Sequence, residues 1–215
     1  MHLPMNTSTY SLLFLGIFLA SFSTKNVGKP LLETVEYQDH KVAYFASGCF
    51  WCVEAIFESV VGVEEAISGY AGGFTKDPTY QKIGTGKTGH AETVAVYYNP
   101  TIVSFETLVA VFFGSHDPTT KNGQHPDYGT QYRSIVFYES ATEKEIIAAT
   151  IKKLNTTIYK GNVKTEVQFF TVFHKAEIEH QNYERLHPDN PYVKAVSIPR
   201  LLRFKRAFPE LLKKK

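Results

Sequence analysis

The chain has 215 residues, of which 43% are hydrophobic and 20% are charged. These values exclude a disordered chain, a collagen-like fibre and a protein with many membrane spans, and they predict one main globular domain. The formal net charge is +2, but the last sixteen residues carry seven basic side chains and one acidic side chain. Because the rest of the chain is therefore net acidic, we expect no nucleic-acid partner.

Residues 1–23 contain no Lys, Arg, Asp or Glu, and residues 11–22 form a mostly apolar run. A run of this length suits the core of a signal peptide and is too short to span a bilayer. We therefore expect a signal peptide at 1–23, an N-terminal extension at 24–39, and an exported protein, periplasmic or secreted. The alternatives are a wrongly chosen upstream start codon or an uncleaved anchor, and without a signal peptide the protein would be cytoplasmic.

The apolar pattern predicts strands and helices in irregular alternation. A strand at 42–46 ends at Ser47-Gly48, and apolar residues at helical spacing from 53 to 60 then place Cys49 at the first turn of a helix. Further strands are expected at 64–70, 93–98, 134–138 and 167–173, and further helices at 104–113, 140–154 and 176–186. Long loops at 71–89 and 116–131, both rich in turn residues, are typical of functional segments.

This irregular alternation predicts an α+β fold, namely a two-layer α/β sandwich with a mixed central sheet covered by helices. The chain shows no internal repeat and no low-complexity tract, which agrees with a single domain. We expect the catalytic domain at 40–199 and a basic C-terminal tail at 200–215.

The only two cysteines, Cys49 and Cys52, are spaced as Cys-x-x-Cys. A bridge across so short a loop would stabilise the fold by only about 2 kcal/mol, so redox or metal chemistry explains the pair better. A zinc site would need a second ligand pair, which the histidines do not offer at finger spacing, and we expect no metal. A helix N-terminus would stabilise the Cys49 thiolate, so Cys49 is the predicted nucleophile.

A series of short motifs runs through about residues 40 to 208. They are Gly-Cys-Phe-Trp-Cys-Val-Glu at 48–54, Gly-Tyr-Ala-Gly-Gly at 69–73, Asp-Pro-Thr-Tyr at 77–80, Thr-Gly-His-Ala-Glu at 88–92, His-Asp-Pro at 116–118, Asp-Tyr-Gly-Thr-Gln-Tyr-Arg-Ser at 127–134, and Ala-Glu, His-Gln and Asn-Pro-Tyr between 176 and 192. In this order they resemble the peptide methionine sulfoxide reductases of the A type.

The resemblance implies a set of site residues. They are Cys49 as nucleophile, Phe50 and Trp51 as pocket aromatics, Glu92 as proton donor, and Tyr80, Tyr132 and Asp127 as hydroxyl and carboxyl partners. The chain departs from the commoner family pattern at Cys52, where many members have glycine and place a resolving cysteine near the C-terminus. Since no cysteine follows Cys52, the resolving role is expected to fall on it.

The chemistry also follows from these residue types. A sulfoxide sulfur is electrophilic only when its oxygen is hydrogen-bonded or protonated, so an acid must stand beside the thiol. Glu92 lies between a glycine-rich loop and an apolar strand, where desolvation would raise its pKa and keep it protonated. Tyr80 and Tyr132 would donate hydrogen bonds to the oxygen, and Trp51 with Phe50 would hold the S-methyl group.

The expected reaction begins when Cys49 attacks methionine S-sulfoxide, free or in proteins, and becomes a sulfenic acid as methionine leaves. Cys52 then forms a disulfide with it, and a thioredoxin-type dithiol reduces that disulfide. The preference for the S epimer and the thioredoxin-type partner are implied by the resemblance. We expect no metal, flavin or nicotinamide cofactor, and a monomer.

Two other functions are open on the residues alone. One is a general thiol–disulfide oxidoreductase, because Cys-x-x-Cys after a strand and at the start of a helix is typical of thioredoxin-like proteins. The other is a methionine-binding module without catalysis. The first of these leaves Glu92, Tyr80 and Tyr132 without a role.

Overall fold

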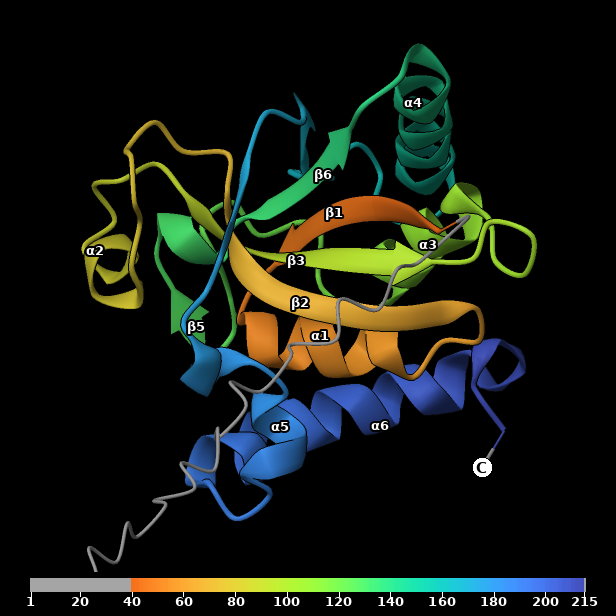
Figure 1. Ribbon diagram of the computed structural model, residues 1–215. Coiled ribbons are helices and arrows are strands. Elements are labelled where there is room, and N and C mark those ends of the chain that lie inside the picture. The colour runs from red at the N-terminus through yellow and green to blue at the C-terminus, as the bar shows by residue number, and fades with distance from the viewer. Residues whose placement is uncertain (1–39, 215) are drawn as a thin grey trace, which may run out of the picture. The chain divides into compact units, whose positions relative to one another are not determined.

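A six-stranded sheet forms the centre of the computed structural model, which describes residues 40–214 (Figure 1). The signal peptide expected at 1–23 and the extension expected at 24–39 lie outside these residues. The strands are β1 (Lys41–Ser47), β2 (Val63–Ala71), β3 (Ala91–Tyr98), β6 (Ser134–Tyr138), β7 (Glu166–Phe169) and β8 (Phe173–Lys175). They lie in the order β7-β6-β1-β3-β2-β8. Only β6 and β7 are parallel, so the sheet is mixed, as expected.

Strands β7 and β8 lie at opposite edges of the sheet, although only residues 170–172 link them. Such a link spans at most about 14 Å, whereas six flat strands would hold their edges about 24 Å apart. The sheet therefore curls until its edges approach. Tyr44 of β1 stacks on Phe170 with ring centroids 3.7 Å apart, so the link passes over the middle of the sheet. The prediction of one strand at 167–173 is wrong, because this packing divides the segment between two edges.

Helices cover the sheet and one another. They are α1 (Phe50–Glu58), α2 (Tyr80–Gly84), α3 (Phe105–Gly114), α4 (Ala141–Thr157), α5 (Tyr183–Leu186) and α6 (Ile198–Ala207). Helix α1 lies directly against β2, and α6 covers the outer side of α1 (Figure 1). Ser104 and Ser140 cap α3 and α4 by accepting hydrogen bonds from the N–H groups of Thr107 and Glu143, which confirms the two expected helix starts.

An aromatic layer in the core fixes helix α1 on the sheet. Phe45 of β1 stacks on Phe57 of α1 and on Phe112 of α3, with ring centroids 4.8 and 5.5 Å apart. All three side chains are fully buried. Burial of each contributes about 1.5–3 kcal/mol, so this layer holds α1 and the residues at its N-terminus in one position.

The segment 176–186 is not the continuous helix that its spacing predicts. A 3₁₀ turn at Ile178–His180 (η2) is followed by Asn182 in the left-handed region, with φ 54°, before α5 begins. The Gln181 side chain accepts a hydrogen bond from Ser68 N and donates one to Ser68 O on β2, and Asn182 N donates to the Glu54 carboxylate. These tertiary bonds take the backbone out of the helical path.

The boundary expected between residues 199 and 200 falls inside helix α6. Arg200 and Phe204 of this helix are buried, with 8% and 2% of their surface exposed. The first half of the predicted basic tail therefore belongs to the domain, because the apolar side of helix α6 packs on α1. Within residues 40–214, no helix has the length and apolar character needed to cross a membrane.

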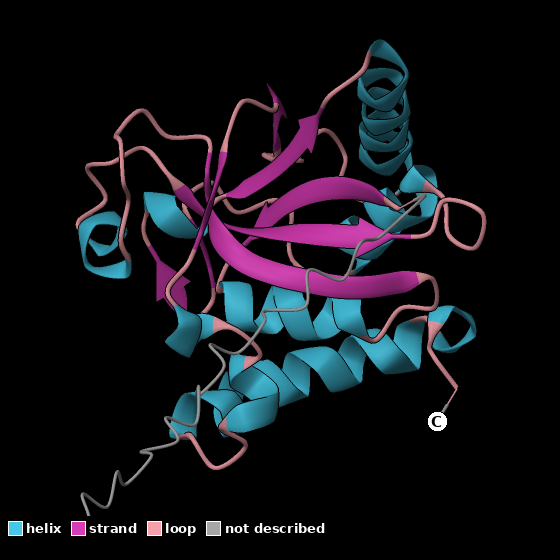
Figure 2. Ribbon diagram, viewed as in Figure 1, coloured by secondary structure: helices cyan, strands magenta, loops and turns pink. Residues whose placement is uncertain are grey.

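Connecting segments gather at the end of the sheet where α1 begins, and Figure 2 shows them as loops around the short helix α2. The long segment expected as a loop at 116–131 contains a small hairpin of β4 (Gly123–Gln124) and β5 (Asp127–Tyr128), followed by a 3₁₀ turn at Thr130–Tyr132 (η1). This end of the molecule carries the candidate site.

Candidate active site

Cys49 stands at the junction of strand β1 and helix α1, as expected. It is the residue directly before the helix, and its carbonyl accepts hydrogen bonds from Cys52 N and Val53 N. Gly48 makes this junction possible, because it has φ +89° and a Cβ added there would lie 2.7 Å from Cβ of Gln124. The thiol of Cys49 is thereby set at the helix N-terminus, with 6% of the residue exposed.

Cys49 and Cys52 face each other across one helical turn as free thiols in hydrogen-bonding contact. Burial raises the pKa of Cys49 well above its usual value, and the hydrogen bond to Cys52 raises it further. The pKa of Cys52 is lowered to about 7, first by the hydrogen bond from Cys49 and then by the Arg200 charge and Ser197. Desolvation of the buried Cys49 thiol thus opposes the stabilisation of its thiolate expected from the helix N-terminus.

Glu92 lies on strand β3, one residue after its start, rather than in the loop before it. It is 2% exposed, and its Oε2 accepts a 2.9 Å hydrogen bond from Phe50 N at the first turn of α1. Burial raises the pKa of Glu92 to about 8, and the Phe50 bond opposes that shift. The predicted rise of this pKa is confirmed, so the carboxyl is mostly protonated near neutral pH and available as a proton donor.

Tyr192 is a further residue of the site. It belongs to one of the short sequence motifs, but the sequence alone predicts no role for it. Its hydroxyl donates a 2.5 Å hydrogen bond to Oδ2 of Asp127 and is in hydrogen-bonding contact with Cys49. Burial raises the pKa of Asp127, and the bond from Tyr192 opposes this shift. Asp127 therefore meets the nucleophile through Tyr192, a connection that no local spacing indicates.

Tyr80 and Tyr132 lie close enough to the thiol and the acid for their charges to interact. Burial raises the pKa of both phenols, that of Tyr80 to about 12, and the charges of Glu92, Cys49 and Asp127 add to both shifts. Both hydroxyls therefore stay protonated at neutral pH and can donate hydrogen bonds. Tyr80 is 36% exposed at the start of α2, so it forms the rim of the site.

Aromatic rings form a wall beside the thiol. Trp51 stacks on Tyr183 at 3.7 Å between ring centroids and meets the edge of Tyr192 at 5.9 Å. Phe50 is fully buried beneath His180, whose ring lies 5.4 Å from Phe50 and 4.3 Å from Tyr80. Of the two aromatics expected to line the pocket, Trp51 is half-buried, whereas Phe50 reaches no solvent. His180 and Tyr183 come from the segment wrongly predicted as a helix, so the sequence reasoning missed them.

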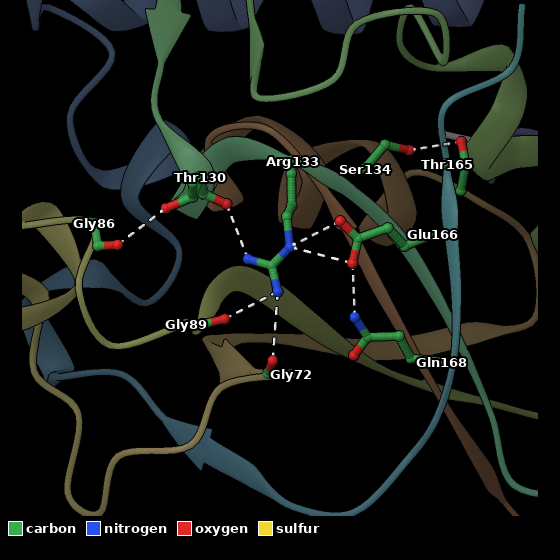
Figure 3. A network of polar contacts seen from close by, with 9 residues as sticks. All are labelled: Gly72, Gly86, Gly89, Thr130, Arg133, Ser134, Thr165, Glu166 and Gln168. Atoms are coloured by element: carbon green, nitrogen blue, oxygen red, sulfur yellow. Dashed lines mark hydrogen bonds and ion pairs between the residues drawn. The ribbon is translucent and has the colours of Figure 1, made fainter.

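Arg133 binds together the loops around the site, as Figure 3 shows. Its guanidinium donates to the carbonyls of Thr130 and Gly89 at 2.9 Å, to that of Gly72 at 3.4 Å, and to Glu166. These acceptors belong to the two ends of the glycine-rich loop, the turn before Tyr132, and strand β7. The glycine-rich loop, which carries Tyr80, is thus held next to the start of strand β6. The buried guanidinium of Arg133 satisfies several backbone carbonyl groups at once.

The chain is similar to known proteins over most of its length. Residues 41–211 match the family model described as peptide methionine sulfoxide reductase. The chain belongs to the peptide methionine sulfoxide reductase family. The peptide methionine sulfoxide reductase MsrA of Natronomonas pharaonis is 45% identical over 169 residues, which is 78% of this chain and 95% of the relative. The MsrA of Trichodesmium erythraeum is 46% identical over 164 residues, 76% of this chain and 93% of the relative.

Solved structures of the family share the fold. Reduced Mxr1 from Saccharomyces cerevisiae is similar with a TM-score of 0.66 and 31% identity, over 72% of this chain and 90% of that chain. Methionine sulfoxide reductase A of Corynebacterium diphtheriae gives 0.63 and 34%, over 75% and 77%. The α+β fold and the family expected from the motifs are confirmed. As a member of this family, the protein is an oxidoreductase that acts on methionine sulfoxide.

The described residues hold no group of three or more His, Cys, Asp or Glu side chains arranged to bind a metal ion.

Proposed function

We propose that the protein reduces methionine S-sulfoxide, free or within proteins, by thiol chemistry at Cys49, with Glu92 as the acid and Cys52 as the resolving thiol. The observation that carries this proposal is the hydrogen bond from Phe50 N to Glu92. It holds a protonated carboxyl at the same helix turn that presents Cys49. A general thiol–disulfide oxidoreductase needs no buried acid beside the nucleophile, so this bond favours sulfoxide reduction.

In the first step the Cys49 sulfur attacks the sulfoxide sulfur while Glu92 gives its proton to the sulfoxide oxygen. The thiol proton of Cys49 passes to the Cys52 sulfur, which already accepts its hydrogen bond. The neutral hydroxyls of Tyr80 and Tyr132 donate hydrogen bonds to the sulfoxide oxygen, and Trp51 packs on the methyl group of the substrate. The hydroxyl then moves from the substrate sulfur to the Cys49 sulfur, and the bond between the two sulfurs breaks with its electron pair left on the substrate sulfur. Methionine leaves, and Cys49 becomes a sulfenic acid.

In the second step Cys52 attacks the Cys49 sulfenic acid, which releases water and forms a disulfide. The two residues are three apart on one helix, where Cα atoms lie about 5 Å from each other, within the range that a disulfide tolerates. The low pKa of Cys52 supports this role, because the thiolate is the attacking form. A dithiol reductant of the thioredoxin type then restores both thiols by exchange.

Mass spectrometry of the reduced protein after addition of methionine sulfoxide tests the proposal. We expect both thiols to be lost as a disulfide and one equivalent of methionine to form, from the S epimer and not from the R epimer. Reduction of insulin disulfides without any methionine formation would instead support a general oxidoreductase. Binding of methionine sulfoxide with both thiols retained would support a binding module.

Export and a monomeric state are part of the same proposal. The uncharged apolar run before Thr24 supports export. The C-terminal helix α6 packs on α1 of the same chain, which supports a monomer. Sequencing of the mature protein from its native host should begin near Thr24, and a cytosolic product that begins at Met1 would exclude export. Sedimentation analysis should give the mass of one chain.

A further inference from the structure

Cys52 lies on the wall of a cavity of about 770 Å³, whose lining residues other than Cys52, Asp127 and Tyr192 have no part in the proposed sulfoxide reaction. The cavity is bounded by the end of α3, the segment 115–125, Tyr159 and helix α6. Cys49, Phe50 and Trp51 do not line it. The Cys49 thiol therefore lies at the aromatic substrate site, whereas Cys52, 1% exposed, lies on the wall of a cavity that adjoins this site through Asp127 and Tyr192.

Arg200 forms the polar centre of this cavity. The residue is 8% exposed, and its guanidinium donates to Ser115 O at 2.8 Å and to Ser47 O at 2.9 Å. These bonds use Nε and Nη2, and Nη1 has no hydrogen-bond partner within residues 40–214. Arg203, one helical turn further along α6, also lines the cavity and forms no ion pair with any described residue. The cavity thus offers one buried and one exposed guanidinium to a ligand.

Two carboxyl groups also lie on the wall, and each accepts hydrogen bonds from a neighbouring residue. Asp117 accepts hydrogen bonds from the backbone N–H and hydroxyl of Thr119, and Asp127 accepts one from Tyr192. His116 is held neutral, because burial lowers its pKa to about 3, and the charge of Arg200 adds to that shift. His125 lies on the same wall. A ligand that enters this space meets guanidinium groups beside the sulfur of Cys52.

We propose that this cavity binds a small thiol of about tripeptide size that carries carboxylate groups. This thiol reduces the Cys49–Cys52 disulfide by attacking the sulfur of Cys52. Cavities of this volume hold ligands of that size. A carboxylate fits Arg200 and Arg203, since guanidinium binds carboxylates through paired hydrogen bonds. The reactive group is a thiol, because Cys52 supplies the only sulfur on the wall among residues 40–214 and its disulfide is opened by thiol exchange. This inference rests on the proposed function, which supplies the disulfide.

The exchange balances with two molecules of the thiol. The first thiolate attacks the Cys52 sulfur, the bond between Cys52 and Cys49 breaks, and Cys49 leaves with the electron pair and takes a proton from Glu92. A second thiolate attacks the ligand sulfur of the mixed disulfide and releases the Cys52 thiolate. The two ligand thiols are oxidised to their disulfide, the protein disulfide gains two electrons, and water restores the proton of Glu92.

The test uses the full chain, oxidised by one equivalent of methionine sulfoxide or, independently, by diamide. The rate of disulfide reduction is measured with glutathione and with its diethyl ester, a matched probe that lacks both carboxylates. We expect glutathione to react about tenfold faster, as for an electrostatically guided ligand, and with saturation. Peptide mapping of the quenched reaction should place glutathione on Cys52. If diamide forms the disulfide but methionine sulfoxide does not, the proposed function is wrong. The rates with glutathione and its ester can still be measured on the diamide-oxidised protein.

Variants of helix α6 separate the site from general surface charge. Arg203→Gln should lower the glutathione rate about fivefold and leave the rate with the ester unchanged. Arg206→Gln is the matched control, because Arg206 lies on the same helix and does not line the cavity. The proposal is overturned if glutathione and its ester react alike with the wild-type protein, if Arg206→Gln has the effect of Arg203→Gln, or if glutathione is found on Cys49.

Discussion

The backbone N–H of Phe50 donates a 2.9 Å hydrogen bond to Oε2 of Glu92, so one helical turn presents Cys49 and also holds the acid beside it. The first turn of α1 has no acidic residue of its own, and the helix N-terminus receives this carboxyl from strand β3. The bond from Phe50 opposes protonation of Glu92, whereas burial favours it, and burial is the larger effect.

Glu92→Gln should slow methionine formation in a single turnover by about 100-fold or more, because a positioned proton donor contributes at least that much. Only the protonated carboxyl donates, so the wild-type rate should also fall as pH rises through about 8, the pKa of Glu92. The variant should lack this fall. Glu145→Gln is a control, since Glu145 is an exposed carboxyl on α4 that has no part in the site. A wild-type rate in Glu92→Gln would remove this acid from the mechanism.

Cys52→Ser should still form about one equivalent of methionine per chain, because Cys49 and Glu92 remain in place. The sulfenic acid of Cys49 would then have no internal thiol and should react with dimedone. Turnover with a thioredoxin-type reductant should fall at least about tenfold, and dithiothreitol should restore much of it. Cys49→Ser should form no methionine with any reductant. Full thioredoxin-dependent turnover of Cys52→Ser would contradict the resolving role, since the chain has no third cysteine.

Tyr192→Phe removes the hydroxyl that joins Asp127 to Cys49. The ring contacts with Trp51 should persist, so we expect substrate to bind while methionine formation slows by about tenfold, as for the loss of one preorganised donor. Single-turnover kinetics over a range of substrate concentrations separate the two effects. Tyr128→Phe is the control, because Tyr128 follows Asp127 directly and is 76% exposed. Equal effects of the two substitutions would show that Tyr192 acts only through general packing.

Glu54 should make the protein less stable as pH rises. Its pKa is raised from 4.5 to about 7, chiefly by burial, so the folded state binds this proton more tightly than the unfolded state. The resulting stabilisation is complete below about pH 4.5 and is lost as pH rises through about 7, a change of up to about 3 kcal/mol. Urea unfolding at pH 5 and pH 8 should show a smaller loss for Glu54→Gln. Glu145→Gln, an exposed change on α4, should keep the wild-type difference, and an unaltered difference in Glu54→Gln would exclude this origin.

Short-range patterns in the sequence determined most elements and the position of Cys49, the proposed nucleophile. The break at Ser47-Gly48 followed by helical spacing placed Cys49 at a helix N-terminus, and the capping serines marked the starts of α3 and α4. These features depend on neighbours within one or two turns, which the sequence displays directly. The motifs in chain order were sufficient for the family, because each is itself a short segment.

Contacts between distant segments decided the rest. Glu92 meets Phe50 across 42 positions, Tyr192 meets Asp127 across 65, and Arg200 meets Ser47 across 153, so no local spacing indicates these pairs. The raised pKa of Cys49 has the same kind of origin, since it follows burial of the thiol and its contact with Cys52 in the folded chain. The helix expected at 176–186 failed because Gln181 and Asn182 bond to β2 and α1 instead of continuing the helix. A hydrogen bond or a desolvation free energy depends on what the folded chain brings near a group, and only the tertiary structure supplies that information.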